Sequence, residues 1–494
     1  MSEGVEEELK REQWISRIAF ILAVWGSMTG LGNVWNWPFK VSAFGGPFIV
    51  VYLVMLFLVG IPVVITEFVL GSTTRRAFPI ALKKIDKRFE FFGWFAFVNT
   101  LVLNGFYLVI IGWALIYAVY SITGMTLDGP LGPATYSDQP AFFVNMLFSP
   151  IVFVAAVIVW LMNYFIVKEG TRGIERVVLF SFPLLWVIII MLMVFGMSFQ
   201  ESISGLNFYL TADLAAFLNP SLWFTAVSLA FFKLSAGFGI LVAYASYLPR
   251  RGEINNSSAI SALLDTSFAF TAGLAIFSIA AIMGYLGSGG AGFAFVVWPA
   301  GTAKFGGPVL SFVFFLMMVI LGLTSSISLV EAMTAALMDK FGLPRRKAVL
   351  VVILTGIVSS LPFSLWLPAP GLAGEIDVTW GLYLLDIMDF YVENFGLVTM
   401  GLVELILVAW IWGVDKLINY ANEASDFKLP PAAKWLFKVV APTGTALALV
   451  SVLLVIVSQG LYLAGTVLDI WAPIIWATIV IVGAAILTSV RGIE

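Results

Sequence analysis

Residues 226–239, AVSLAFFKLSAGFG, place a lysine in the middle of an apolar segment. No acidic residue lies within ten positions of Lys233, so the local sequence offers its charge no partner. A charge at the centre of a membrane-spanning helix costs at least about 2.5 kcal/mol on insertion scales. Two glycines, Gly237 and Gly239, follow the lysine at the same depth. The stretch therefore predicts a helix that breaks near the middle of a membrane and a lysine that faces the protein interior.

The composition of the whole chain is that of a polytopic membrane protein in a lipid bilayer. Of its 494 residues, 61% are hydrophobic and 11% are charged, whereas soluble domains carry roughly 25% charged residues. Cysteine and histidine are absent, which excludes disulfides, thiolate metal sites and the usual proton shuttle. We find no basic stripe that would indicate nucleic acid and no nucleophile–base pair or phosphate loop that would indicate an enzyme.

Apolar runs long enough to cross the hydrocarbon core predict an all-α fold with twelve transmembrane helices. They fall near residues 15–38, 47–71, 92–121, 142–166, 177–199, 222–248, 260–287, 308–338, 347–367, 394–418, 435–459 and 468–490. All but three of the 26 basic residues lie in the N-terminal tail, in alternate loops or at the C-terminal end; the exceptions are Lys40, Lys233 and Lys304. This bias predicts that both termini are cytoplasmic. The short outer loops favour a prokaryotic plasma-membrane protein.

The first span is interrupted like the sixth. Residues 23–38, AVWGSMTGLGNVWNWP, contain three glycines at mid-depth. Glycine-interrupted spans at matching positions of two halves indicate a transporter built from inverted repeats; glycines that only pack helices closely are the alternative. We expect a cytoplasmic tail (1–13), a first five-helix repeat (14–199), a second, inverted one (200–420) and two peripheral C-terminal helices (421–494). Broken helices offer N-termini to a carboxylate and free carbonyls to a cation.

These segments resemble the neurotransmitter:sodium symporter family. The resemblance is carried in order by REQWISRIAFILA with GLGN, GGPFIVVYLVMLFLVGIP, GIERV, SGLNFYLTADL, LSAGFG with YASY, LTSSIS, LDIMDF and GLVELILVAWIWGVDK. It implies a Na⁺-coupled symporter of amino acids or amines that works by alternating access.

The resemblance also implies binding residues. The family's second sodium site corresponds to carbonyls of Gly26, Thr29 and Leu321 and hydroxyls of Thr324 and Ser325; the alternative is that these hydroxyls bond back to their own helix. The substrate site corresponds to Met28, Gly30, Leu31, Gly32, Leu103, Tyr107, Phe232, Lys233, Ser235, Phe238, Ser325, Ser326 and Leu329.

The gates match the family in part. Arg11 and Asp339 resemble the cytoplasmic gating pair, with Ser246 and Tyr247 beside them. On the outside, Asp389 matches the gate aspartate, but Asn36 replaces its usual arginine partner. Glu331, near the cytoplasmic end of the eighth span, is expected in a solvated vestibule, with a proton site as the alternative.

The sequence leaves the family pattern at the first sodium site. Asn33 persists, but Lys233 replaces a threonine or serine and Asp265 replaces an asparagine. We hypothesise that Lys233 is a tethered cation in place of the first sodium and that Asp265 neutralises it. A purely structural salt bridge is the alternative. Chloride dependence is not expected, because Leu229 and Ala269 replace polar chloride ligands and Asp265 repels an anion.

The leading hypothesis is therefore an importer of an amino acid or related small zwitterion or carboxylate, driven by one Na⁺ at the second site. A proton-coupled transporter that uses Lys233 and Asp265 is an alternative. A receptor that binds solute without transporting it is another.

Overall fold

The computed structural model describes residues 12–493 apart from 131, 212, 250–251, 287–291, 369–378 and 460–466. The first half is helical except for one short antiparallel hairpin, in which Thr126 of β1 lies opposite Thr135 of β2. Its elements are α2 (Arg17–Met28), η1 (Leu31–Asn33), α3 (Asn36–Phe44), α4 (Pro47–Met55), η2 (Leu56–Gly60), α5 (Ile61–Thr74), α6 (Phe78–Ile85), η3 (Lys87–Phe89), α7 (Glu90–Thr123), β1 (Thr126–Leu127), β2 (Ala134–Thr135), α8 (Gln139–Leu147), α9 (Ile151–Val167), α10 (Thr171–Met197), α11 (Ser202–Leu210) and η4 (Leu214–Leu218).

The second half consists of helices throughout its described elements. They are α12 (Pro220–Lys233), α13 (Ile240–Ala245), α14 (Asn255–Met283), η5 (Phe293–Val297), α16 (Trp298–Phe341), α17 (Arg345–Ser360), η6 (Pro362–Ser364), α18 (Trp380–Tyr391), η7 (Val392–Leu397), α19 (Val398–Ile406), η8 (Leu407–Gly413), α20 (Val414–Glu423), α21 (Ala433–Trp435), η9 (Leu436–Val440), α22 (Ala441–Gln459) and α23 (Val467–Ser489).

Within the described residues, eight helices are long and apolar enough to cross a membrane, or ten if each of two bent pairs is one span. The predicted count of twelve is therefore not confirmed. Two expected spans are made of short helices: α12 and α13 have 14 and 6 residues, and α17 has 16. The tenth span also differs from its predicted range, since helix runs continuously through Trp380–Glu423.

Both predicted breaks are present. Helix α2 and the segment Leu31–Phe44, which comprises η1 and α3, meet at 60° across a gap that begins at Thr29. In the sixth span, α12 ends at Lys233, and Ser235, Gly237 and Gly239 adopt positive φ before α13 begins. Glycine enters this region without the steric cost that other residues meet. The backbone thus leaves the helix at both places that the glycine pattern predicts.

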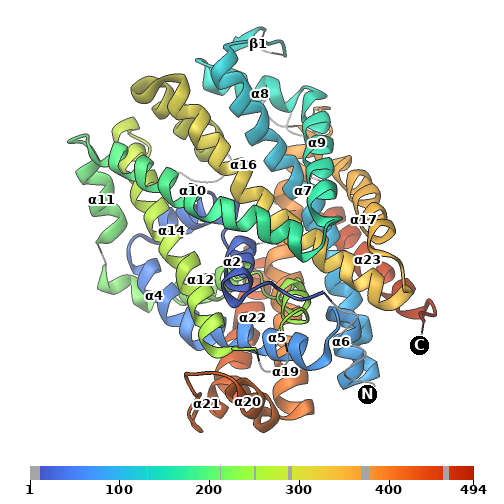
Figure 1. Ribbon diagram of the computed structural model, residues 1–494. Helices are drawn as coiled ribbons and strands as arrows, with labels where there is room; N and C mark the ends of the chain where they lie inside the picture. Colours follow the sequence, from blue (N-terminus) through green and yellow to red (C-terminus); the bar gives the residue numbers. More distant parts are fainter. Residues whose placement is uncertain are drawn as a thin grey trace.

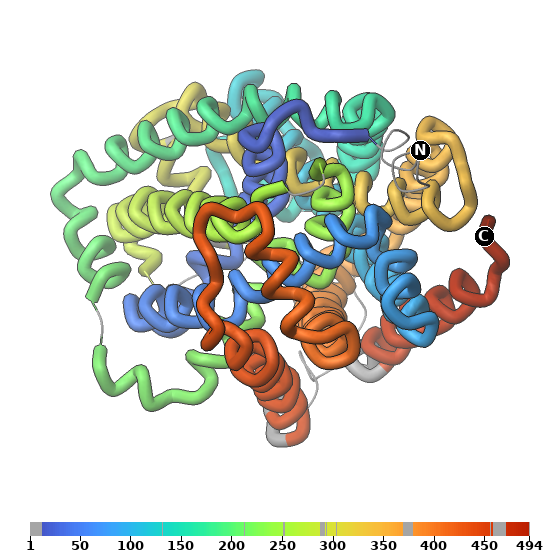
Figure 2. The backbone as a smooth tube through the Cα atoms, turned by 60° about the horizontal axis from the view of Figure 1, so that its bottom comes forward, coloured from blue at the N-terminus to red at the C-terminus, as the bar shows by residue number. Residues whose placement is uncertain are grey.

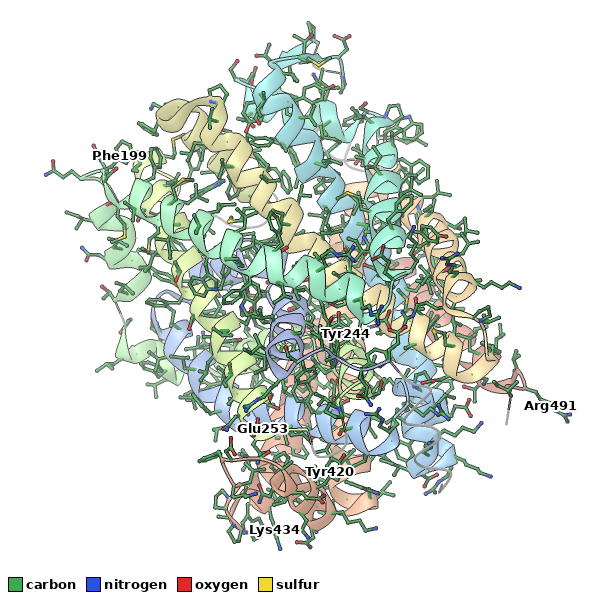
Figure 3. The ribbon with its side chains drawn as sticks, in the orientation of Figure 1. Phe199, Tyr244, Glu253, Tyr420, Lys434 and Arg491 are labelled. Atoms are coloured by element: carbon green, nitrogen blue, oxygen red, sulfur yellow. The ribbon has the colours of Figure 1, made fainter. Side chains whose placement is uncertain are left out.

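The broken helices lie inside the bundle. Helix α2 packs against α10, α14 and α16, and Figure 1 shows it near the centre with these three around it. Tyr244 of α13 lies near the centre of the side-chain view, far from Lys434 and Arg491 at its edge (Figure 3). Helix α22, in orange-red, extends beyond the other helices in Figure 2. Unwound backbone is therefore enclosed by protein, where its polar groups can find partners.

Candidate functional site

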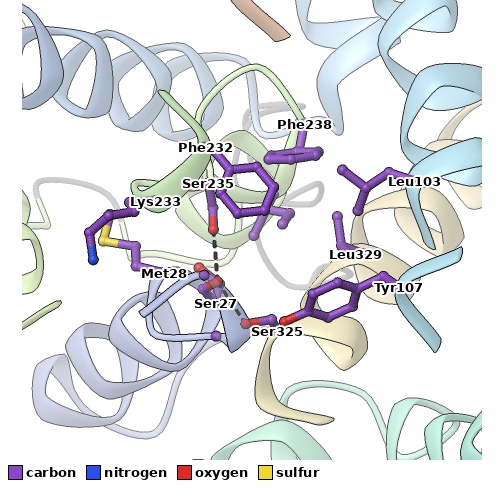
Figure 4. A pocket seen from close by; sticks show the side chains of 13 residues that line it. Ser27, Met28, Leu103, Tyr107, Phe232, Lys233, Ser235, Phe238, Ser325 and Leu329 are labelled. Carbon is purple, nitrogen blue, oxygen red and sulfur yellow. Dashed lines mark hydrogen bonds between the residues drawn. The ribbon is translucent and has the colours of Figure 1, made fainter. Parts of the chain in front are cut away.

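A cavity lies where the two breaks meet, and Figure 4 shows the side chains around it. Its lining comes from α2 and the turn after it, from α7, from the α12–α13 break and from α16. The lining residues are Ser27, Met28, Gly30, Gly32, Leu103, Tyr107, Phe232, Lys233, Ser235, Phe238, Ile240, Ser325 and Leu329. Eleven of the thirteen residues predicted for the substrate site are among them. Ser27 and Ile240 were not predicted, although each is close in sequence to a residue that was.

Backbone from the first break faces one side of this cavity. The Leu31 N–H donates to the Tyr107 hydroxyl at 3.1 Å, which ties the break to α7. A Cβ atom at Gly30 would overlap the Ser325 hydroxyl and lie 2.7 Å from the Tyr107 oxygen, and one at Gly32 would lie 2.9 Å from the Phe232 ring. Only glycine therefore fits at these two positions of the cavity wall, because the neighbouring side chains pack directly against the backbone.

Two predicted lining residues lie outside the cavity wall. Leu31 contributes its N–H to Tyr107 and is otherwise buried. The Ser326 hydroxyl bonds to Asn163 on α9 at 3.1 Å and to the Leu323 carbonyl at 3.1 Å. Successive residues of a helix point about 100° apart, so Ser325 and Ser326 face different neighbours. Ser326 therefore joins α16 to α9 and does not line the cavity.

Four of the five residues expected at the second sodium site, Gly26, Leu321, Thr324 and Ser325, lie close together. The Ser325 hydroxyl lies 3.4 Å from the Gly26 carbonyl and 3.1 Å from the Ser27 carbonyl, so α16 and the end of α2 present oxygens to each other. The Thr324 hydroxyl donates to the Leu321 carbonyl of its own helix at 3.0 Å, which is the alternative that the sequence left open. Neutral oxygens from two helices nevertheless converge here, in a set that suits a hard cation.

Lys233, Asp265 and Asn33 form a closed cluster beside the cavity, which we call the lysine triad. The Lys233 Nζ atom lies 2.9 Å from Asp265 Oδ2 and also donates to Asn33 Oδ1. Asn33 Nδ2 donates to Asp265 Oδ1 at 2.8 Å, and the Thr29 hydroxyl donates to the same oxygen at 3.1 Å. Both charged side chains are 0% exposed. The predicted partner of Lys233, 32 positions along the chain, is thus in direct contact with it.

The ammonium of Lys233 points away from the cavity. Figure 4 shows the side chain directed away from Tyr107, Phe232 and Phe238. Its Nζ atom lies 5.4 Å from the centre of the Trp37 ring and 6.0 Å from that of Tyr52, within reach of a cation–π attraction. Lys233 therefore lines the cavity only with the base of its side chain.

At the predicted cytoplasmic end, Arg11 lies outside the described residues. Asp339 accepts a hydrogen bond from the Ala77 N–H at 2.6 Å and lies 3.7 Å from Arg76. Ser246 bonds to the Ala243 carbonyl of its own helix at 2.5 Å. Asp339 therefore links α16 to the α5–α6 turn.

Glu331 was expected in a solvated vestibule, and the structure corrects this. Its side chain is 0% exposed, and it pairs with Arg345 at 2.6 Å. The Tyr247 hydroxyl donates to it at 2.5 Å, and Arg345 also pairs with Glu12 at 2.9 Å. Opposite charges across the α16–α17 turn draw the carboxylate inward, and the network joins the N-terminal segment to α13, α16 and α17.

On the opposite side of the cavity, Asn36 does not take over the contact expected of the family arginine. Its Nδ2 atom donates to Glu393 Oε2 at 3.1 Å, one helical turn beyond Asp389. Glu393 was not singled out by the sequence analysis. Its position four residues after Asp389 was the available signal.

Comparisons with known proteins agree with this geometry. A family model for the sodium:neurotransmitter symporter family matches residues 11–128 and 146–491. An uncharacterized sodium-dependent transporter of Methanocaldococcus jannaschii is 35% identical over 457 residues, which cover 88% of this chain and 89% of that protein. The sodium- and chloride-dependent GABA transporter 2 of Rattus norvegicus is 28% identical over 488 residues, covering 88% and 79%.

A solved structure gives the same result. The crystal structure of MhsT in complex with L-phenylalanine matches with a TM-score of 0.79 at 30% identity, and covers 89% of this chain and 99% of that one. The broken helices and the cavity between them thus occur in a chain whose relatives are sodium-dependent transporters. The chain belongs to the sodium:neurotransmitter symporter family, a family of membrane transporters.

Proposed function

We propose that this protein imports an amino acid or a related small zwitterion or carboxylate by Na⁺-coupled symport. The glycine backbone of the first break and the Tyr107 hydroxyl can hold a carboxylate. Leu103, Phe238 and Leu329 make the rest of the cavity largely apolar, which suits an apolar side chain. L-Phenylalanine, the ligand in the MhsT structure, is a compound of this class.

One sodium ion binds at the second site in this proposal. The Gly26, Thr29 and Leu321 carbonyls and the Thr324 and Ser325 hydroxyls supply oxygens without formal charge, which suits a monovalent cation. This ion would stabilise the contact between α2 and α16, because its ligands come from both. Its release towards the cytoplasm would free that contact.

The lysine triad replaces the first sodium ion. The observation that carries this proposal is the contact of Lys233 Nζ with both Asp265 and Asn33 in a site sealed from solvent. An ammonium carries the charge of Na⁺ and donates to oxygens that would otherwise coordinate the ion. Because Asp265 is anionic and Leu229 and Ala269 offer no polar group, no chloride is required.

Uptake into proteoliposomes tests the coupling. Initial uptake of L-phenylalanine and a panel of other amino acids, titrated against Na⁺, should follow a Hill coefficient near one. A coefficient near two would contradict a single sodium ion. Uptake that persists without Na⁺ but stops when the pH gradient is dissipated would favour the proton-coupled alternative, and binding without counterflow would favour a receptor.

A further inference from the structure

The continuous helical segment α18–η7 carries three carboxylates, Asp386, Asp389 and Glu393, spaced so that they lie near one face. Asp386 and Asp389 belong to α18, and Glu393 lies in the first turn of η7, four residues after Asp389. Glu393 is 4% exposed, and its Oε1 atom has no hydrogen-bond partner in the described part of the chain. A buried carboxylate oxygen without a donor is costly. A cation beside this face would offset that cost, and none is in contact with Glu393 among the described residues.

Helix α3 and the α18–η7 chain run in opposite directions past the cavity. Helix α3 starts just after Gly32, which lines the cavity, and so leads away from it. The α18–η7 chain approaches the cavity, because the Leu397 carbonyl lies 2.8 Å from where a Cβ atom of Gly237 would be, in the break of the sixth span. The two segments are therefore antiparallel.

The bond between Asn36 and Glu393 sets the register of these two segments. Lys40 lies one turn, about 5.4 Å, beyond Asn36 on the same face of α3. Asp389 lies one turn before Glu393. In an antiparallel pair this places Lys40 level with Asp389, and within reach of Glu393.

The electrostatics agree with this register. Lys40 is close enough for its charge to act on both Asp389 and Glu393. Its side chain is half-buried, and no ion pair within 4 Å joins it to either carboxylate among the described contacts. Lys304, the other basic residue outside the cytoplasmic loops and the spans, is placed on α16 with its ammonium over Phe305. The Lys40 ammonium also lies near a ring, 5.4 Å from the centre of Phe39, but Lys40, unlike Lys304, is close enough for its charge to act on Asp389 and Glu393.

We propose that Lys40 is the cation of the extracellular gate, and that it pairs with Asp389 and Glu393 when the cavity closes. This inference rests on the proposed transport function and assigns the closing contact to a residue one turn beyond Asn36. An ammonium is a compact point charge on a flexible stem, so Lys40 can move between the two carboxylates as α3 approaches α18. Asn36 keeps the segments in register while this contact forms and breaks.

Cysteine accessibility tests the gate, because the natural chain has no cysteine. Leu103→Cys provides a reporter on the cavity wall, and a neutral methanethiosulfonate reagent is added outside sealed proteoliposomes in Na⁺ buffer. Lys40→Gln should raise the labelling rate at least threefold, whereas the matched control Lys304→Gln should leave it unchanged. Lys40→Arg should keep labelling slow.

A second variant tests whether faster labelling comes from the loss of a cation at this gate and not from some other effect of the substitution. Adding Asn36→Arg to Lys40→Gln restores a cation beside Glu393, one turn from Asp389, and should return labelling to within twofold of the reporter alone. Equal labelling rates for Lys40→Gln and Lys304→Gln would overturn the gate assignment. The labelling rate does not depend on how many sodium ions are coupled, so a Hill coefficient of two would overturn the lysine triad and leave this result standing.

Discussion

Replacing Lys233 alone should destabilise the protein far more than replacing Lys233 and Asp265 together. At the observed 2.9 Å separation and an effective dielectric constant of about 20, the gross attraction of the pair is about 6 kcal/mol. Much of it offsets the cost of burying both charges. Removal of one partner from such a pair typically costs about 3–5 kcal/mol, because the other charge stays buried without compensation. Lys233→Thr and Asp265→Asn should each fall in that range.

The double variant should recover most of the loss, since neither buried charge remains. We expect a coupling of at least about 2 kcal/mol in the double-mutant cycle, where loss of the lysine methylenes cancels. The free energy of unfolding of each variant is measured by titrating the purified protein in detergent with sodium dodecyl sulfate and monitoring tryptophan fluorescence. Single effects that add to within about 0.5 kcal/mol would refute the electrostatic account of the pair.

Three further changes test the cavity and the cytoplasmic network. Gly30→Ala places a methyl group against Ser325, so substrate affinity in a scintillation proximity assay should fall at least about tenfold; unchanged affinity would mean that the backbone does not face the ligand. Tyr107→Phe removes one hydroxyl contact and should weaken binding in the same assay by about 5–10-fold, as expected for about 1 kcal/mol, whereas no change would exclude that hydroxyl from the site. Arg345→Met leaves Glu331 buried without its cation and should cost about 3–5 kcal/mol of unfolding free energy; Glu331→Gln added to it should restore most of this, and no recovery would contradict the pairing.

The helix breaks could be predicted from glycines close by in the sequence. The lysine triad could be predicted from the positions at which the sequence departs from the family pattern. Glycines at mid-depth mark where a helix can unwind, and Gly237 and Gly239 do adopt positive φ. Lys233 and Asp265 depart from a family pattern at positions that share one ion site, so the resemblance itself paired them. An isolated lysine in an apolar run also demands a partner on physical grounds.

The missed contacts lacked such signals. Whether Ser326 faces the cavity depends on the rotation of α16 and on an asparagine from α9, 163 positions away. Glu331 has several basic residues nearby in sequence, and only the geometry of the α16–α17 turn selects Arg345. The bond between Asn36 and Glu393 spans 357 positions, and the spacing of Glu393 from Asp389 does not by itself specify it.

The span count shows a different limit. Hydropathy marks residues 222–248 as one apolar span, but the chain there forms two helices, α12 and α13, and neither alone is long enough to cross a membrane. The same glycines that identify the binding site thus make the sixth span harder to count.

Direct counting of bound sodium tests the central claim, that Lys233 stands in for an ion. Equilibrium binding of ²²Na⁺ to the purified protein should saturate at one ion per chain, and the Lys233→Thr, Asp265→Asn double variant should bind two. The double variant restores neutral oxygen ligands beside Asn33, where the ammonium had been. Two ions in the natural protein, or no gain in the double variant, would contradict the account and leave the lysine triad as a structural salt bridge.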